Sequence, residues 1–404
     1  MGFDGIEREP GRVSVREKGE KSLRAGHPWV YSGGVASVKG APGAGDWVGV
    51  YGGGERFYGW GHYSPESRIA VRVLEWGGDA PPGEDWWRSR LSQAVERRRE
   101  VPPPGPDSAR RLVHGESDGL PGLVLDRYGS YLVLQAFTAG MDRRKEEIAS
   151  IAAAEVGAAG VYERSDTEVR RLEGLGPSAG LLVGEEPPDR VTIAEGECSF
   201  LVDIRGGQKT GFYIDQRRNR EVVARHASGR RVLDLFCYTG AFACASLTGG
   251  AEEVLLVDSS PAALALAEMN LVRNGHPRDR WRVEKGNAFE VARSLRDRGE
   301  SFDLVVVDPP KLAPTRAHAP RAGRAYKDIN LLAIKLCRPG GLVASFSCSA
   351  GVDAGRFQQI LAWAAVDAAR EVRILERFSQ PPDHPVSLRF PEGEYLKGLL
   401  CRVD

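Results

Sequence analysis

Five apolar runs, separated by segments of helical length, dominate the second half of this 404-residue chain. In order, the runs are RRVLDLF, EEVLLVD, RWRVEKG, FDLVVVD and GLVASFS. Continuous β-branched stretches such as LVVV are typical of strands buried on both faces of a parallel sheet. Two later runs, EVRILERF and YLKGLLCRV, are joined by a turn-rich link too short for a crossover helix, so the last strand should be antiparallel. The pattern predicts a Rossmann-like α/β domain over residues 191–404.

The region before this domain has a different pattern. Residues 11–78 hold short β-prone runs broken by glycine-rich turns, which indicates a small β-barrel or sandwich. The next region reads strand, strand, helix, strand, with a hairpin turning at Tyr128–Ser130 and a helix over 141–156. We therefore expect a multidomain α/β protein with a β-barrel-like domain at 1–80, a central α+β linking domain at 85–190 and the Rossmann-like domain at 191–404.

The composition narrows the classes of function. The chain is 42% hydrophobic and 27% charged, as expected of a globular protein, and no apolar run approaches the roughly 20 residues of a membrane-spanning helix. No signal segment is apparent, so we expect a cytoplasmic protein without a membrane partner. Its six cysteines show no metal-ligand spacing, and no metal is expected. Because the net charge is zero, any nucleic-acid site must come from local basic patches.

Polar residues stand where the first three strands of the Rossmann-like region end, and ligands of open parallel sheets bind at such ends. Asp234 and Gly240 flank the first turn, which lacks the GxGxxG dinucleotide fingerprint. An acid there would repel a pyrophosphate but can accept a hydrogen bond from the ammonium group of a methionine moiety. Asp258 follows 24 residues later, where a carboxylate can bind ribose hydroxyls, and Asn287 follows the third strand, where adenine would be read. This order predicts S-adenosylmethionine as the cofactor.

Several longer motifs resemble one known family. DIRGGQKTGFYIDQRRNR, VLDLFCYTGAF, VVVDPPKLA and FSCS are similar to the large-subunit (23S) rRNA cytosine-C5 methyltransferases that carry a PUA domain. The resemblance implies a class I methyltransferase fold, an N-terminal PUA domain, a linking domain and large-subunit rRNA as partner. It also implies that residues 209–212 line the methionine end of the cofactor. One departure is Asn287, where the family usually has Asp. The full set of expected cofactor residues is Lys209, Thr210, Gly211, Phe212, Asp234, Phe236, Tyr238, Thr239, Gly240, Asp258, Ser259, Asn287, Ala288 and Asp308.

The fourth and fifth strands end in groups suited to covalent catalysis. Cytosine C5 is a poor nucleophile, but a thiolate added to C6 makes C5 enamine-like and able to take up a methyl group. Cys348 follows the fifth strand and is the expected catalytic nucleophile. Asp308, after the fourth strand, is the expected catalytic partner on the N3/N4 edge of the base. Better-known RNA cytosine-C5 enzymes carry a second cysteine where this chain has Lys311, and the sequence does not identify the base that removes the C5 proton.

Two basic stretches are expected to bind RNA. Between Pro310 and Asp328 the chain contains five cations and no acid, which predicts a flexible basic loop for a phosphate backbone. A second patch falls in the PUA-like region, where Glu17 and Glu20 dilute it. The residues predicted to contact RNA are Lys311, Arg316, Arg321 and Arg324 in the loop, with Lys327 as the fifth cation, and Lys21, Arg24, His27 and Trp29 in the PUA-like region.

Two other functions remain open from the sequence. The Asp308-Pro309-Pro310 motif is also used to methylate exocyclic nitrogens of purines without a covalent step, although Lys311 cannot stack on a base as an aromatic residue would. A non-catalytic RNA-binding or ribosome-assembly factor could retain the cofactor pocket for folding. The sequence does not identify the modified nucleotide, and it leaves a homodimer open.

Overall fold

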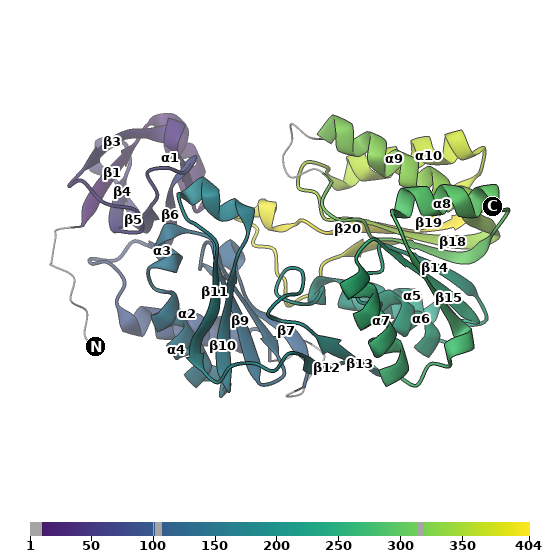
Figure 1. Cartoon of the computed structure of the whole chain (residues 1–404). Coiled ribbons are helices and arrows are strands. Elements are labelled where there is room, and N and C mark those ends of the chain that lie inside the picture. The colour runs from purple at the N-terminus through teal and green to yellow at the C-terminus, as the bar shows by residue number, and fades with distance from the viewer. Residues whose placement is uncertain (1–9, 100, 102–106, 313–318) are drawn as a thin grey trace. The chain divides into compact units, whose positions relative to one another are not determined.

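The computed structural model describes residues 10–99, 101, 107–312 and 319–404, and it forms two compact units (Figure 1). The first unit comprises Met1–Val191, Val202–Phe212 and Pro382–Gly393. The second comprises Thr192–Leu201, Tyr213–Pro381 and Glu394–Asp404. Each unit is described by itself below. The division into domains at 1–80, 85–190 and 191–404 stays a prediction.

The second unit contains a seven-stranded sheet in the order β16-β15-β14-β17-β18-β20-β19. Strands β14 to β18 run parallel, whereas β20 is antiparallel to both of its neighbours. The predicted Rossmann-like fold with an antiparallel last strand is therefore confirmed. The strands are β14 (Arg231–Leu235), β15 (Glu253–Asp258), β16 (Trp281–Lys285), β17 (Phe302–Val307), β18 (Cys337–Ser347), β19 (Val372–Ser379) and β20 (Lys397–Val403).

Helices cover both faces of this sheet, which explains why its central strands are apolar throughout (Figure 1). Leu233, Val305 and Val343 are at most 1% exposed, and they pack in one core with residues of the covering helices. One face carries α5 (Arg217–Arg225), α6 (Ala241–Thr248) and α7 (Pro261–Arg273), and the other carries α8 (Ala288–Asp297), α9 (Ala319–Leu336) and α10 (Ala354–Ala368). A separate hairpin is formed by β12 (Val191–Glu195) and β13 (Cys198–Val202).

The first unit begins with a six-stranded sheet in the order β2-β6-β5-β4-β1-β3. Four of its strands fall in the predicted β-prone runs, and β2 and β3 are additional. Those two escape prediction because β2 is only three residues long and most of β3 is exposed. The elements are β1 (Gly11–Val15), α1 (Glu17–Arg24), β2 (Trp29–Tyr31), β3 (Val35–Lys39), β4 (Trp47–Tyr51), β5 (Phe57–Tyr63) and β6 (Ile69–Trp76).

A second sheet of the first unit has the order β11-β10-β9-β8-β7. The predicted hairpin is confirmed, since Tyr128 pairs with Tyr131 at its turn. Helices α2 and α4 cover this sheet with Trp87, Leu91 and Ile148, all at most 2% exposed. The elements are α2 (Glu84–Glu96), β7 (Ala109–His114), β8 (Leu123–Tyr128), β9 (Tyr131–Ala136), α3 (Ala139–Asp142), α4 (Lys145–Val156), β10 (Gly160–Ser165) and β11 (Ser178–Gly184).

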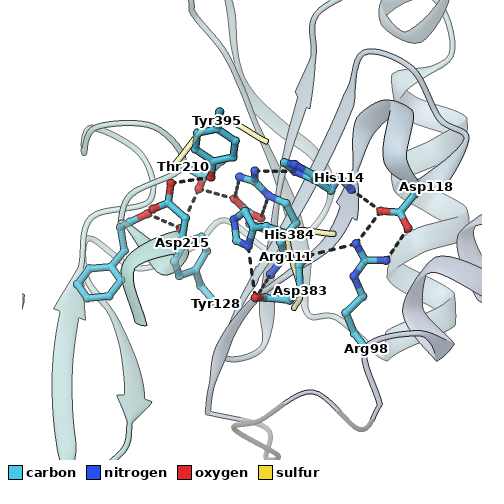
Figure 2. A network of polar contacts seen from close by, with 12 residues as sticks. Arg98, Arg111, His114, Asp118, Tyr128, Thr210, Asp215, Asp383, His384 and Tyr395 are labelled. Atoms are coloured by element: carbon cyan, nitrogen blue, oxygen red, sulfur yellow. Dashed lines mark hydrogen bonds and ion pairs between the residues drawn. The ribbon is translucent and has the colours of Figure 1, made fainter. Parts of the chain in front are cut away.

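A buried polar network lies beside this second sheet (Figure 2). Arg98 donates two hydrogen bonds of 2.6 Å to Asp118, and both side chains are at most 1% exposed. Asp118 also accepts from the backbone N–H of His114 at 2.7 Å. Because a charge buried without its partner is costly, each member of this pair depends on the other.

Candidate functional site

The loop that follows β14 has an unusual backbone. Phe236 and Tyr238, which are not glycine, have φ values of 65° and 49°, and Gly240 has a φ of 76°. Such left-handed conformations are strained for residues with a Cβ and cluster at ligand-binding sites. The backbone N–H of Tyr238 donates to the Asp258 carboxylate at 3.0 Å, which ties this loop to the end of β15. The first and second strand ends are therefore joined into one rim.

Asp234 is buried at the base of this rim. It is 1% exposed, and neither carboxylate oxygen has a well-formed hydrogen bond within the described part of the chain. Burial and the charges of Asp308 and Asp258 raise the pKa of Asp234 to about 8, and the backbone amide of Ala243 offsets this only in part. A buried acid in this state favours a cationic ligand group, so Asp234 fits the ammonium group of a methionine moiety.

The two other predicted cofactor positions already accept backbone hydrogen bonds. Asp258 accepts from Tyr238 through one oxygen and from the Ser260 N–H at 2.9 Å through the other. Asn287 caps helix α8, since its side-chain oxygen accepts from the Phe289 N–H at 3.0 Å. Each of these oxygens has a second lone pair for a ribose hydroxyl or an adenine amino group. The cap also fixes the direction in which the Asn287 side chain points.

Asp308 and Cys348 follow neighbouring parallel strands, β17 and β18, and therefore lie at the same edge of the sheet. Cys348 is partly exposed, whereas the other five cysteines are buried. Burial is the largest cause that raises the pKa of Tyr213, and the charges of Asp308 and Cys348 contribute to it. Tyr213 packs edge-on against Tyr238, with ring centroids 5.4 Å apart. The four side chains thus gather where the predicted cofactor loop meets the predicted nucleophile.

The segment 209–212 belongs to the first unit, where it is held by buried contacts. The Thr210 hydroxyl lies 2.8 Å from the Tyr128 hydroxyl and donates to Asp126 at 2.7 Å. Asp126 in turn pairs with Arg111 at 2.8 Å. Lys209 has a φ of 52°, a strained value for a lysine. The role of this segment at the methionine end of the cofactor stays a prediction.

The predicted basic loop is partly wrong, because its second half is helical. Arg321, Arg324 and Lys327 lie on α9, and Ala322, Tyr326 and Ile329 pack inward at helical spacing. Lys327 is also opposed by an acid, since it pairs with Asp367 at 2.6 Å.

Four residues of this stretch stay candidates for RNA contact. Lys311, Arg321 and Arg324 are exposed, and Arg316 lies outside the described residues. Arg321 and Arg324 line a cavity of about 570 Å³ with Arg293 and Asn287. The cations thus border the predicted adenine position.

The PUA-like residues predicted to bind RNA differ in their surroundings. Lys21 is exposed, and Arg24 pairs with Glu20 at 3.0 Å. His27 lies 3.3 Å from a carboxylate oxygen of Glu392. Trp29 donates to Glu116 at 2.8 Å and packs on Phe390, with ring centroids 4.8 Å apart. Of these four side chains, Lys21 is the one best placed for a phosphate group.

Sequence reasoning missed Tyr213, Tyr326 and Lys397. Tyr213 stands in the recognised motif but has no catalytic signature of its own. Tyr326 stands in the basic stretch between Pro310 and Asp328, where nothing in the sequence marks it. Lys397 reaches the site only because β20 inserts beside β18. In the described residues, no group of acids, histidines and cysteines could hold a metal, and no helix is long and apolar enough to cross a membrane.

The strand order and the acids at the strand ends define a class I S-adenosylmethionine-dependent methyltransferase. A family described as "S-adenosylmethionine-dependent methyltransferase" matches residues 145–402, and a "PUA-like domain" matches residues 13–76. Two solved structures share the fold with a TM-score of 0.84, and each match covers 97% of this chain and 99% of the other. One is a putative SAM-dependent methyltransferase from Streptococcus mutans, 19% identical, and the other is a putative methyltransferase complexed with SAH, 20% identical.

Curated relatives narrow the family further. Ribosomal RNA large subunit methyltransferase I of Tolumonas auensis is 44% identical over 97% of this chain and 99% of its own length. The protein of the same name from Photobacterium profundum is 43% identical over 95% and 97%. The chain therefore belongs to the S-adenosylmethionine-dependent methyltransferases, in the family of these large-subunit methyltransferases I. It is an enzyme that uses S-adenosylmethionine, and the resemblance noted in the sequence is confirmed.

Replacing Asp234 with asparagine should weaken cofactor binding and strengthen the fold at high pH. Loss of a charge-assisted hydrogen bond is expected to lower the affinity for S-adenosylmethionine by about 10- to 100-fold. The raised pKa means that the cofactor-free folded state binds a proton that the unfolded state releases. Stability is therefore lost as the pH rises from about 4 to about 8, and Asp234→Asn should abolish this loss.

Calorimetric titration with the cofactor, and urea unfolding at pH 5 and pH 9, measure the two effects. Wild-type affinity in Asp234→Asn would exclude Asp234 from the cofactor site. Asp279→Asn, which removes an exposed acid in the same unit, is the matched control and should change neither quantity.

Proposed function

We propose that this enzyme methylates C5 of a cytosine in large-subunit rRNA through a covalent adduct between Cys348 and C6. The observation that carries the proposal is the position of Cys348, the one partly exposed cysteine in the described chain, at the same sheet edge as Asp308. The name of the relatives, ribosomal RNA large subunit methyltransferase I, supports the RNA substrate.

The order of the chemical steps follows from the electron demand of the base. The Cys348 thiolate adds to C6 and breaks the C5–C6 double bond, so that electron density moves to C5. S-adenosylmethionine would supply the methyl group to this carbon as a sulfonium electrophile, with S-adenosylhomocysteine as the leaving group. Removal of the C5 proton by a base then restores the double bond and expels the Cys348 thiolate. The bond between the enzyme and C6 is thus broken again, and the cytosine leaves with a methyl group in place of the C5 proton.

Asp308 is proposed to hold the base during these steps. A carboxylate at this edge can accept from the N4 amino group, and a protonated carboxyl group can donate to N3 as charge develops on the ring. The two prolines that follow have restricted φ angles and no N–H groups, which keeps this turn in one conformation. Asp308 thereby orients the base toward Cys348.

The residues proposed to bind the cofactor are the strand-end set of the second unit, and the assignment of segment 209–212 to its methionine end rests on the sequence resemblance alone. Asp234 is assigned to the ammonium group, Asp258 to the ribose and Asn287 to adenine. The RNA backbone is assigned to Lys311, Arg321 and Arg324, which are exposed on the approach to α9 and on its first turns. The division into PUA-like, linking and methyltransferase domains is part of this proposal.

Nucleoside analysis tests the proposal directly. Large-subunit rRNA is incubated with the enzyme and cofactor carrying an isotopically labelled methyl group, digested to nucleosides and measured by mass spectrometry. We expect label in 5-methylcytidine. Label on adenosine or guanosine would replace the proposal with exocyclic-nitrogen methylation. No labelled nucleoside, with cofactor binding intact, would favour a non-catalytic assembly factor.

The arginines of α9 give a second prediction. Arg321→Ala and Arg324→Ala should each weaken RNA binding and should lower the slope of log affinity against log salt by about 1. Lys335→Ala is the matched control, because it removes an exposed cation from the far end of the same helix. Filter binding across a salt series measures both quantities. An unchanged slope in both arginine variants would exclude phosphate contact by this helix.

A further inference from the structure

Cys348 is a partly exposed residue between two buried neighbours. Ser347 and Ser349, on either side of it, are both 0% exposed. Ser347 ends β18 and therefore has its backbone fixed by the sheet. Because both neighbours are buried, the position of the Cys348 thiol depends on what holds these two serines.

The phenol of Tyr326 holds both serines from the side of α9. The Ser347 hydroxyl donates to the Tyr326 oxygen at 2.9 Å, and the Tyr326 and Ser349 hydroxyls are also 2.9 Å apart. Tyr326 is itself 0% exposed and packs edge-on against Phe357 of α10, with ring centroids 5.7 Å apart. A single buried hydroxyl group thus bridges the two residues that flank Cys348.

Lys397 holds the same segment from the side of β20. It is the first residue of that strand and the register partner of Ser347. Its ammonium group donates to the carbonyl of Ser349 at 2.8 Å and to the carbonyl of Val352 at 2.7 Å. The Lys397 ammonium thus fixes the turn that follows Cys348, and its positive charge interacts with the thiol.

We propose that Tyr326 and Lys397 form a clamp that positions Cys348, and that the Lys397 charge favours its thiolate form. The inference rests on the proposed covalent role of Cys348. Tyr326 and Lys397 are positioning residues, since they act through the cysteine and its turn. A cation beside a thiol lowers the thiol pKa and raises the fraction of nucleophilic thiolate at neutral pH.

Lys397 is a cation in electrostatic contact with Cys348, and its charge therefore favours the thiolate. Tyr213, Tyr326 and Lys397 are each in electrostatic contact with Cys348. Burial raises the pKa of both tyrosines, so they stay neutral at pH 7. Burial lowers the pKa of Lys397, and the Cys348 charge opposes that change. Lys397 also interacts with three groups of mixed sign, Asp353, Glu394 and Lys311.

The pH dependence of thiol alkylation tests the role of the charge without RNA or cofactor. Cys348 is alkylated with iodoacetamide from pH 5 to pH 10 in the full chain, and Cys348→Ala supplies the background from the buried thiols. We expect Lys397→Met to raise the pH at which the alkylation rate is half-maximal, the alkylation midpoint, by about one pH unit. This slows alkylation at pH 7 about tenfold. Lys397→Arg, which keeps the charge, should restore most of the rate. A wild-type midpoint in Lys397→Met would overturn the proposal.

Two further variants keep the proposal testable if Lys397→Met does not fold. Lys397→Gln retains a donor for the carbonyls but lacks the charge, and its alkylation midpoint should rise as in Lys397→Met. An unchanged midpoint overturns the role of the charge.

Tyr326→Phe keeps the charge but removes the hydroxyl that bridges the serines. We expect its kcat for methyl transfer to fall about tenfold, with KM values within about twofold of wild type. An unchanged kcat in Tyr326→Phe overturns the clamp.

The experiments distinguish failure of the proposed covalent mechanism from failure of the clamp. If Cys348→Ala retains methyl transfer, the covalent mechanism is wrong whatever the alkylation midpoints are. If Cys348→Ala is inactive and Lys397→Met alkylates like wild type, the covalent mechanism stands and the clamp is wrong.

Discussion

Replacing Cys348 with alanine should lower the rate of methyl transfer by about a thousandfold or more. Without the thiolate, C5 of cytosine lacks the electron density to take up a methyl group, and no other cysteine of the described chain is exposed enough to substitute for it. Single-turnover transfer of labelled methyl groups to rRNA measures the rate. Affinity for S-adenosylmethionine should stay within about twofold, because the proposed cofactor contacts are at other strand ends.

The control for this experiment is Cys244→Ala. Cys244 is 0% exposed within α6, where alanine is a good helix former, so its loss should leave the rate near wild type. A rate near wild type in Cys348→Ala itself would exclude the covalent mechanism.

RNA containing 5-fluorocytidine gives an independent measure of the adduct. Fluorine replaces the C5 hydrogen and cannot be abstracted as a proton is, so the thiolate is not expelled after methyl transfer. Wild-type enzyme should therefore remain attached to the RNA in denaturing gels in the presence of the cofactor. The Cys348→Ala variant should show no attached species. Attachment by this variant would assign the nucleophile to a different residue.

Removing Asp118 should cost about 3–5 kcal/mol of unfolding free energy in the first unit, the usual effect of stranding a buried charge. Arg98 would remain 1% exposed with its carboxylate partner gone and with only the carbonyls of Ala94 and Asp383 as acceptors among its described contacts. Urea unfolding of Asp118→Ala followed by tryptophan fluorescence measures this, since six of the eight tryptophans belong to the first unit.

Two controls separate the buried pair from ordinary surface effects. Glu96→Ala breaks the exposed pair with Arg99, and it should change the free energy by at most about 1 kcal/mol. The double variant Arg98→Met with Asp118→Leu removes both charges and should recover much of the loss. If the urea concentration at the unfolding midpoint of Asp118→Ala equals that of the wild type, the pair does not contribute to stability.

The sheet of the second unit was predictable because its strands carry their own signal. Runs such as LVVV are apolar on both faces, and Asp234 and Asp258 mark the points where two of them end. The loop that follows Asp234 is tied in the structure to the second of these acids, since the Tyr238 N–H donates to Asp258. What was predictable, therefore, is the position of polar residues directly at a strand end.

Contacts between segments distant in sequence were not predictable. Arg321 and Arg324 were placed in a loop because the stretch is rich in cations and contains no acid, but the inward packing of Tyr326 and Ile329 stabilises a helix there. Lys397 carried no signal, because its function depends on the register of β20 with β18. A register is set by packing across the whole sheet, and one sequence does not reveal it.

The strand order has a consequence for synthesis on the ribosome. β20 is made after β19 yet lies between β18 and β19, so β19 has no sheet partner until residues 397–403 are available. Until then β18 presents an open edge, which is the kind of surface that pairs with other chains. The nascent protein should therefore be most prone to aggregation in the interval between the synthesis of β18 and that of β20, and a chaperone that covers a strand edge would act in that interval.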